Sequence, residues 1–328
     1  MKLLSLPTDT AIPFMRYRKI AIVISIILSL LSIGLFATVG MNYGIDFRGG
    51  TVVELRFKEA PQIADLRREI GSLNLGDVQI VEFGAPTDVL IRVEEQPGGE
   101  AAQQRAVILL REMFGEAADF RRVEVVGPRV SGELARAGAI AVIAALIAIM
   151  AYIWIRFEWH FAIGAVLTTL HDVILTIGLF SATQIEFNLS SIAAVLTIVG
   201  YSLNDTVVVY DRVRENLRRF KRLAMADLLD RSINQMLART LMTSITTLLA
   251  LIALFVFGGE VIRSFTFAMI WGVVVGTFSS IFIASPLLII LNLRPGRMGG
   301  GKADDASKDD AGEGDSGGDA PQEAPARA

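Results

Sequence analysis

The 328-residue chain contains no cysteine and only two histidines. Without cysteine there are no disulfide bonds and no thiolate metal sites, and His160 and His171 do not form a cluster with the spacing of a metal site. The sequence also lacks a G-x-x-x-x-G-K-[S/T] loop, so nothing indicates nucleotide chemistry. We therefore expect no metal ion and no cofactor. Any work that the protein does should draw its energy from another source.

Charged residues are also scarce, at 20%, whereas hydrophobic residues make up 52% and the mean hydropathy is +0.51. This is more apolar than a typical soluble domain. The first apolar run follows basic residues but exceeds the roughly 7–15 residues of a signal-peptide core, so we interpret it as an uncleaved anchor. Six runs have about the 20 residues that cross a hydrocarbon core. They are residues 20–39, 137–155, 161–180, 189–210, 241–257 and 265–291.

Positive charge is unevenly distributed among the connections between these runs. Residues 181–188 contain no lysine or arginine, and residues 258–264 contain only Arg263. Cytoplasmic loops are enriched in lysine and arginine, so this asymmetry predicts six spans with both termini in the cytoplasm. The connection between the fourth and fifth runs holds seven basic residues: Arg212, Arg214, Arg218, Arg219, Lys221, Arg222 and Arg231.

The long connection between the first two runs has the pattern of a small domain. Strand-like and helix-like segments follow one another in the order βαββαβ, which is typical of a ferredoxin-like domain with a four-stranded sheet and two helices on one face. The predicted strands are residues 51–57, 78–83, 89–94 and 120–126, the predicted helices are 61–73 and 100–114, and residues 84–88 are predicted to be a loop.

The sequence thus predicts a polytopic α-helical membrane protein with a periplasmic α+β domain. Leu229 and Ile233 indicate an amphipathic helix at the membrane interface within the basic connection. The last segment is rich in Gly, Ala and Asp and is predicted to be a disordered acidic cytoplasmic tail. The predicted parts are the cytoplasmic N-terminus (1–19), the first transmembrane helix (20–40), the periplasmic domain (41–133), helices two to six (134–293) with a cytoplasmic loop (211–238), and the tail (294–328).

Asp205 is the most informative residue, because it lies inside the fourth apolar run. An ionisable group in hydrocarbon costs a few kcal/mol or more and marks a functional site with a partner to be found. Arg239, at the start of the fifth run, is the predicted partner. An ion pair inside a membrane can respond to protonation, but it can equally be a structural pair that fixes helix packing.

Other polar residues recur at helical spacing and are predicted to face inward. Thr168, Asp172 and Thr176 form one stripe on the third run, and Ser202 shares a face with Asp205. On the fifth run the stripe is Arg239, Thr243 and Thr246 or Thr247. His171, Asp172 and Asn204 are possible auxiliary proton carriers, although a buried histidine bonded to a neighbour is an equally good interpretation. Gly272 and Gly276 form a GxxxG pattern that predicts close helix packing.

Three stretches carry a family resemblance. N-Y-G-I-D-F-R-G-G-T at residues 42–51, which includes Gly44, Asp46, Gly49 and Gly50, is similar to the motif that leaves the first helix of SecF subunits. V-G-P with E-L, at residues 126–134, resembles the entry to their second helix. G-Y-S-L-N-D-T-V-V-V-Y-D-R-V-R-E-N, at residues 200–216, resembles their fourth-helix signature. The short connection 41–133 favours SecF over its larger paralogue SecD.

The resemblance implies membership of the RND superfamily and a location in the bacterial inner membrane. It also implies a heterodimer with SecD, association with the SecYEG channel, and contact with secreted polypeptides and membrane lipids. Neither nucleic-acid binding nor enzymatic activity is expected. The implied function is to use the proton-motive force to promote protein export, with Asp205 and Arg239 as the proton relay.

Our mechanistic hypothesis is that protonation of Asp205 breaks its ion pair with Arg239, and that the resulting helix shifts reach the periplasmic domain through the flexible backbone at Gly44, Gly49 and Gly50. Three alternatives stay open. The protein could be an RND-type exporter of small molecules, an intramembrane aspartyl protease with Asp172 and Asp205 as its dyad, or a passive assembly scaffold.

Overall fold

The computed structural model describes residues 10–259 and 262–293. The predicted acidic tail (294–328) and the first nine residues of the predicted N-terminal segment lie outside the described residues. Within the described part, six helical segments are long and apolar enough to cross a membrane, as predicted. They are α1 (Arg18–Thr38), α5 (Pro128–Arg156), α6 (Trp159–Thr183), α7 (Leu189–Arg219), α8 (Met225–Phe257), and the continuous run of α9 (Arg263–Ser279), the π-helix η3 (Ser280–Ala284) and α10 (Ser285–Ile290).

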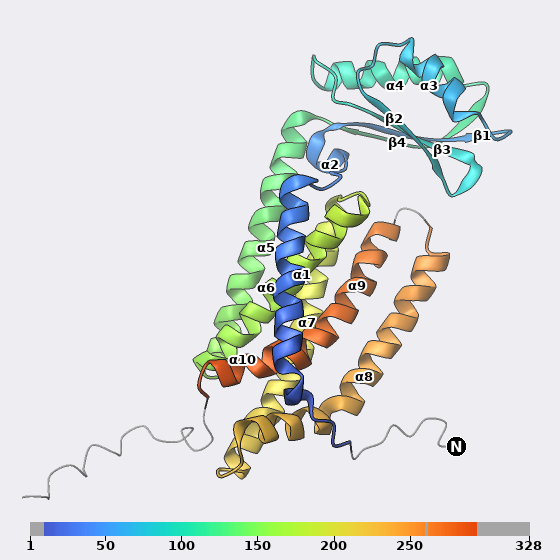
Figure 1. The fold of residues 1–328 in the computed structure, drawn as a ribbon. Helices are drawn as coiled ribbons and strands as arrows, with labels where there is room; N and C mark the ends of the chain where they lie inside the picture. Colours follow the sequence, from blue (N-terminus) through green and yellow to red (C-terminus); the bar gives the residue numbers. More distant parts are fainter. Residues whose placement is uncertain (1–9, 260–261, 294–328) are drawn as a thin grey trace, which may run out of the picture.

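A small α+β domain sits on one end of this helix bundle (Figure 1). We call it the sheet domain and call this end the domain end. The opposite end, which carries the arginine-rich connection, is the basic end. The domain is preceded by a single-turn helix, α2 (Ile45–Arg48). Its elements are β1 (Gly50–Phe57), α3 (Ile63–Gly71), β2 (Val78–Phe83), β3 (Ala85–Val93), α4 (Glu100–Phe114) and β4 (Ala118–Val126).

The sheet has the strand order β2-β3-β1-β4, and all its pairings are antiparallel. Both α3 and α4 cover the face that is turned away from the bundle (Figure 1). Alternate residues of the central strands, such as Val53, Leu55 and Ile91, are fully buried against Ile70 and Leu110 of these helices. Burial of such side chains, at roughly 1.5–3 kcal/mol each, stabilises the domain. The predicted βαββαβ arrangement is therefore confirmed.

One predicted loop in this domain is wrong. Residues 84–88 were expected to separate two strands, but β3 already begins at Ala85, which pairs with Phe83 of β2. Gly84 begins the reversal, with a φ angle of +83° that only glycine adopts without strain. The register then shifts, because Glu82 pairs with Val89, so residues 86–88 belong to β3 but have no partner on β2. The strand therefore begins four residues earlier than predicted, with an irregular first part.

Close contact between α7 and α9 organises the centre of the bundle. A Cβ atom at Gly272 would lie 2.3 Å from the Ile198 side chain, and one at Gly276 would lie 3.1 Å from Ser202. The predicted close packing at the GxxxG pattern is therefore confirmed. Small residues at such an interface allow two helix backbones to approach and maximise van der Waals contact where lipid offers no hydrophobic driving force.

The basic connection between the fourth and fifth spans is shorter than the predicted loop of residues 211–238. Helix α7 continues to Arg219, α8 begins at Met225, and only residues 220–224 separate them. The expected amphipathic segment is the first part of α8, where Leu229 and Ile233 are buried. Charged residues ended the apolar run but did not end the helix, because lysine and arginine are good helix formers.

Candidate functional site

Asp205 of α7 lies against α8 and the π-helix η3 and is only 8% exposed. Its Oδ1 accepts a hydrogen bond of 2.9 Å from the Thr240 hydroxyl of α8. Its Oδ2 accepts one of 2.6 Å from the Ser280 hydroxyl, at the start of the π-helix. Both donors are neutral hydroxyls. An ionised carboxylate without a cation in such a site is costly, and a proton removes that charge.

Asp172 forms a second, fully buried carboxylate site one helix away, on α6. Its Oδ2 accepts hydrogen bonds from the hydroxyls of Ser202 on α7 and Ser279 on α9, the latter at 2.8 Å. Its Oδ1 lies 2.9 Å from Nδ1 of His171. The predicted inward stripe on α6 is confirmed, since Thr168 and Thr176 are also buried.

The two carboxylates belong to one polar network. Ser202 and Asp205 are one turn apart on α7, and Ser279 and Ser280 are adjacent on the last span. Each carboxylate has its own pair of hydroxyl donors, and no hydrogen bond joins Asp172 directly to Asp205 in this network. An aspartyl-protease dyad needs two carboxyls that share a proton, so this geometry gives no support to the proteolytic alternative.

Arg239 does not form the expected ion pair. Its side chain is exposed, and it lines an open cavity of about 430 Å³ at the basic end. Thr243 and Thr246 are exposed as well, whereas Thr240 and Ser244 are buried and Thr247, the alternative to Thr246, is half-buried. The predicted inward stripe on this helix is therefore wrong by one residue, or about 100° of rotation. The sequence identified polar residues on a common face, but the packing of α8 decided which face turned inward.

Asn204 also lies outside the network, because its side chain is exposed beside the buried Asp205. Conversely, sequence reasoning missed three donors: Thr240, Ser279 and Ser280. The serines were hidden in the longest apolar run, in which only the glycines had been singled out. The rule that polar residues in a span face a protein interior would have found them.

The motif at residues 42–51 joins the sheet domain to the domain end of the bundle. The backbone N–H of Gly44 donates to Phe187 O, and that of Phe187 donates to Asn42 O, both at 2.8 Å. The Asp46 carboxylate accepts a 2.7 Å bond from the N–H of Leu189, the first residue of α7. A negative charge at a helix N-terminus is favourable by typically 0.3–1 kcal/mol. Asp46 therefore holds one end of the helix that carries Asp205.

Gly49 and Gly50 begin the sheet domain in conformations that other residues rarely adopt. Their φ angles are +73° and +121°. A Cβ atom at Gly50 would lie 2.5 Å from the carbonyl oxygen of Val93, so the close approach of β1 to β3 also excludes a side chain. In this structure the two glycines fix a sharp entry into the sheet.

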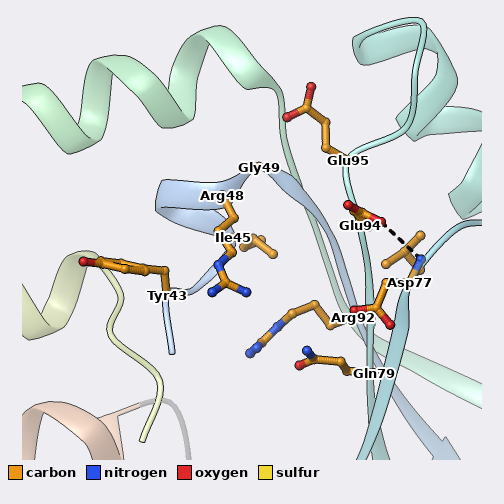
Figure 2. Close-up of a pocket in the computed structure, with 10 residues that line it drawn as sticks. Tyr43, Ile45, Arg48, Gly49, Asp77, Gln79, Arg92, Glu94 and Glu95 are labelled. Atoms are coloured by element: carbon orange, nitrogen blue, oxygen red, sulfur yellow. Dashed lines mark hydrogen bonds between the residues drawn. The ribbon is translucent and has the colours of Figure 1, made fainter. Parts of the chain in front are cut away.

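An open cavity of about 410 Å³ lies beside this entry. Figure 2 shows Arg48 and Arg92 turned toward this space, with Tyr43 on its far side. Arg92, on β3, forms an ion pair with Glu186 of the loop between α6 and α7. Both side chains are less than one-third exposed. This pair is a side-chain link between the sheet domain and the membrane helices.

Two family models match the sequence. One, described as "Protein export membrane protein SecD/SecF, C-terminal", matches residues 107–294. The other, "SecD/SecF GG Motif", matches residues 34–61, the region of Gly49 and Gly50. Together they cover the sheet-domain entry and all the polar residues of the bundle network.

Named relatives agree with these models. The chain is 47% identical to the protein translocase subunit SecDF of Brucella abortus over 92% of its own length, and it spans 40% of that protein. It is 45% identical to the protein translocase subunit SecF of Rickettsia rickettsii, with 86% of this chain and 92% of that protein covered.

Solved structures show the same fold. The crystal structure of SecDF, a translocon-associated membrane protein from Thermus thermophilus, matches with a TM-score of 0.80 and 36% identity. The match covers 89% of this chain and 40% of that one. A super-membrane-facing form of SecDF matches with a TM-score of 0.66.

Six apolar helices, a sheet domain between the first two, and carboxylates buried at the centre of the bundle define a multi-pass membrane protein of the inner membrane. The matched family models and relatives then place it more narrowly. The chain belongs to the SecF family of protein-export membrane proteins.

Proposed function

We propose that this chain is a SecF-type subunit that uses proton movement through the Asp205 network to promote the passage of secreted polypeptides across the inner membrane. The observation that carries the proposal is the buried Asp205 carboxylate, which has two hydroxyl donors and, among the described residues, no ion-pair partner. The family supports protein export, and the comparisons do not favour a small-molecule pump.

The proposed partner is SecD. The chain corresponds to about 40% of the fused SecDF proteins that it matches, and a separate SecD chain would supply the remainder. The helices α1, α5 and α8 leave many large apolar side chains exposed in this chain, among them Ile27, Ile143 and Leu249. These helices are available to contact lipid and SecD. The SecYEG channel and the secreted polypeptide are proposed as further partners.

We place the basic end in the cytoplasm and the sheet domain in the periplasm, because lysine and arginine concentrate in cytoplasmic loops. A proton that enters from the periplasmic side then neutralises Asp205 and leaves toward the basic end. Arg239 faces the cavity at that end, which also exposes Asp211 and Glu215. The transmembrane potential supplies roughly 2.3 kcal/mol per charge for each 100 mV.

In the proposed cycle Arg239 meets the carboxylate in a second arrangement of the helices. The neutral, protonated Asp205 keeps the hydroxyl of Thr240 as its partner on α8. The ionised form attracts the guanidinium of Arg239, which lies one residue before Thr240 and about 100° away around α8. Rotation or displacement of α8 against α7 would exchange the hydroxyl partner for the cation.

Helix α7 is the proposed connection between this exchange and the sheet domain. Its first residue, Leu189, is bound by Asp46. The loop that precedes it carries Glu186, the partner of Arg92 on β3. A shift of α7 therefore pulls on the motif at residues 42–51 and on the sheet at once, in addition to the covalent connections through α1 and α5.

Asp205→Asn tests the proposal. The variant keeps the size and hydrogen-bonding capacity of the side chain but cannot ionise, so we expect it to fold, to bind SecD, and to lose proton-dependent export by at least about tenfold. Export of a secreted protein into inner-membrane vesicles, with and without a proton gradient, measures this.

Asp227→Asn is the matched control, since Asp227 is an exposed acid in the first turn of α8 that does not line the cavity at Arg239. It should export normally. Full proton-dependent export by Asp205→Asn would refute the proposal. The passive-scaffold alternative predicts normal export when Asp205 and Arg239 are both replaced by apolar residues.

A further inference from the structure

Two adjacent serines of the last span bind two different carboxylates. The Ser279 hydroxyl donates to Asp172 at 2.8 Å, and the Ser280 hydroxyl donates to Asp205 at 2.6 Å. Neither serine has measurable exposure to solvent. Consecutive residues of a helix point about 100° apart, so this one turn reaches α6 and α7 simultaneously. The two carboxylates are thereby connected through a single peptide unit.

Each of these hydroxyls has a second acceptor within reach in its own helix. Ser279 Oγ lies 3.1 Å from Gly276 O, and Ser280 Oγ lies 3.0 Å from Thr277 O. A serine hydroxyl has only one proton to donate. It can therefore bond strongly either to the carboxylate or to the helix carbonyl. An ionised carboxylate is the stronger acceptor, so the charge on the carboxylate decides which bond is made.

The backbone at this point departs from α-helical geometry, since the π-helix η3 begins at Ser280. Short π-helical segments are rare and are frequent at functional sites. Pro286, two residues beyond η3, has no N–H to donate to the preceding turn. The last residue of η3 is held by α7 as well, because the Tyr210 hydroxyl donates to Ala284 O at 2.9 Å. Helix α7 therefore binds both ends of the π-helical turn.

We infer that Ser279 and Ser280 are positioning residues that couple the charge states of Asp172 and Asp205, and that Ser280 transmits a change at Asp205 to the π-helical turn. The inference rests on the proposed function, in which Asp205 gains and loses a proton. When Asp205 is ionised, Ser280 donates to it. When Asp205 is protonated, Ser280 turns toward Thr277 O, which changes the start of the π-helix and the neighbouring bond of Ser279.

Among the described residues, four other titratable groups lie near this network. His171 on α6 bonds to Asp172, and Tyr210 on α7 binds the end of η3. Tyr201 on α7 bonds to Ser244, which bonds to Thr277, and Arg239 on α8 faces the cavity at the basic end. None of them bridges the two carboxylates. In the described part of the chain, that position is taken by the two serines and by Ser202, which shares α7 with Asp205.

Infrared spectroscopy of the full chain together with SecD, in lipid vesicles, tests the inference. The carboxyl bands of Asp172 and Asp205 are assigned by their loss in Asp172→Asn and Asp205→Asn. We expect Ser280→Ala to alter the band of Asp172 in addition to that of its direct partner, Asp205. We expect Ser279→Ala to alter the band of Asp205 in addition to that of its direct partner, Asp172. We also expect Asp205→Asn to alter the Asp172 band in the native background but not in the Ser279→Ala/Ser280→Ala background.

Ser285→Ala is the matched control, because Ser285 is a fully buried serine of the same span whose hydroxyl donates to Ser280 O and, among the described residues, to no carboxylate. It should leave both carboxyl bands in place. Ser280→Ala should reduce the rate of proton-dependent export about tenfold, which corresponds to the loss of one hydrogen bond to a charged group. Ser280→Thr, which keeps the hydroxyl, should recover part of that loss.

Bands that respond to Ser279→Ala and Ser280→Ala no more than to Ser285→Ala would overturn the inference. So would an Asp205→Asn effect on the Asp172 band that persists without the two serines, because the carboxylates would then be coupled directly or through Ser202 of α7. If Asp205→Asn exported normally while the band coupling was present, the proposed function would fail and the coupling would stand.

Discussion

Charged residues are satisfied differently in the sheet domain and in the helix bundle. In the sheet domain Asp88 of β3 receives two hydrogen bonds from the guanidinium of Arg56, which lies opposite it on β1. In the bundle, as far as the structure describes the chain, Asp205 receives its bonds only from Thr240 and Ser280. One carboxylate has a permanent cation, whereas the other has neutral hydroxyls that can accommodate either of its charge states.

The difference distinguishes a structural ion pair from a carboxylate that is suited to gain and lose a proton. A guanidinium beside a carboxylate stabilises one charge state, so such a pair fixes geometry and resists protonation. Hydroxyls can donate to a carboxylate or accept from a carboxylic acid. The carboxylate that is suited to change its charge is therefore the one that lacks a fixed cation, in the region where an unpaired charge is most costly.

Among the further tests, Arg239→Met is expected to have the largest effect on export. If Asp205 pairs with Arg239 during the cycle, this variant should lose at least about tenfold of proton-dependent export, measured in vesicles as for Asp205→Asn. Arg239→Lys should retain part, since it keeps the charge but not the planar donor fork. Arg212→Met, an arginine of the same cavity that is already paired with Glu215, should export normally. Normal export by Arg239→Met would mean that hydroxyls alone serve Asp205.

Reversing the ion pair between Arg92 and Glu186 tests whether this link between the sheet domain and the helix bundle contributes to export. Glu186→Arg places a second cation beside Arg92, and like charges there repel, so we expect export to fall about three- to tenfold. Adding Arg92→Glu should recover most of the loss by restoring an opposite pair. A double variant that is as poor as Glu186→Arg alone would show that the pair's polarity matters beyond mere attraction.

The smallest expected effect concerns Asp88, where a hydrogen bond from Arg56 holds the pKa of the carboxyl below its ordinary value of 3.8. A carboxyl whose pKa is lower in the folded state stabilises that state above pH 3.8, and the contribution is lost as pH falls through the lowered pKa. We expect Asp88→Asn to speed hydrogen exchange in β1 and β3 at pH 7, and the difference from the native protein to vanish in strong acid.

Asp65→Asn is the control for this measurement, because its pair with Arg68 lies exposed on α3 and such pairs contribute little. It should not alter the exchange of β1 or β3 at either pH. An equal effect of the two substitutions at pH 7 would mean that the Arg56–Asp88 pair contributes no more than an ordinary surface pair.

The amino-acid pattern alone was enough to predict the spans, the order of elements in the sheet domain and the identity of the buried acids. Apolar length and strand-like alternation are local properties, and an aspartate within a span needs no fold to be recognised as costly. The close packing at Gly272 and Gly276 could also be predicted, because small residues four positions apart in a membrane helix are typical of helix–helix interfaces.

Which faces of these helices meet could be seen only in the folded protein. Whether α8 turns Arg239 or Thr240 toward Asp205 depends on a rotation of about 100°, which periodicity leaves free because any face can pack inward when all faces are apolar enough for lipid. The meeting of Ser279 with Asp172, and of Ser280 with Asp205, joins residues 107 and 75 positions apart. Such contacts arise from the packing of three helices together, and no local property of any one helix specifies them.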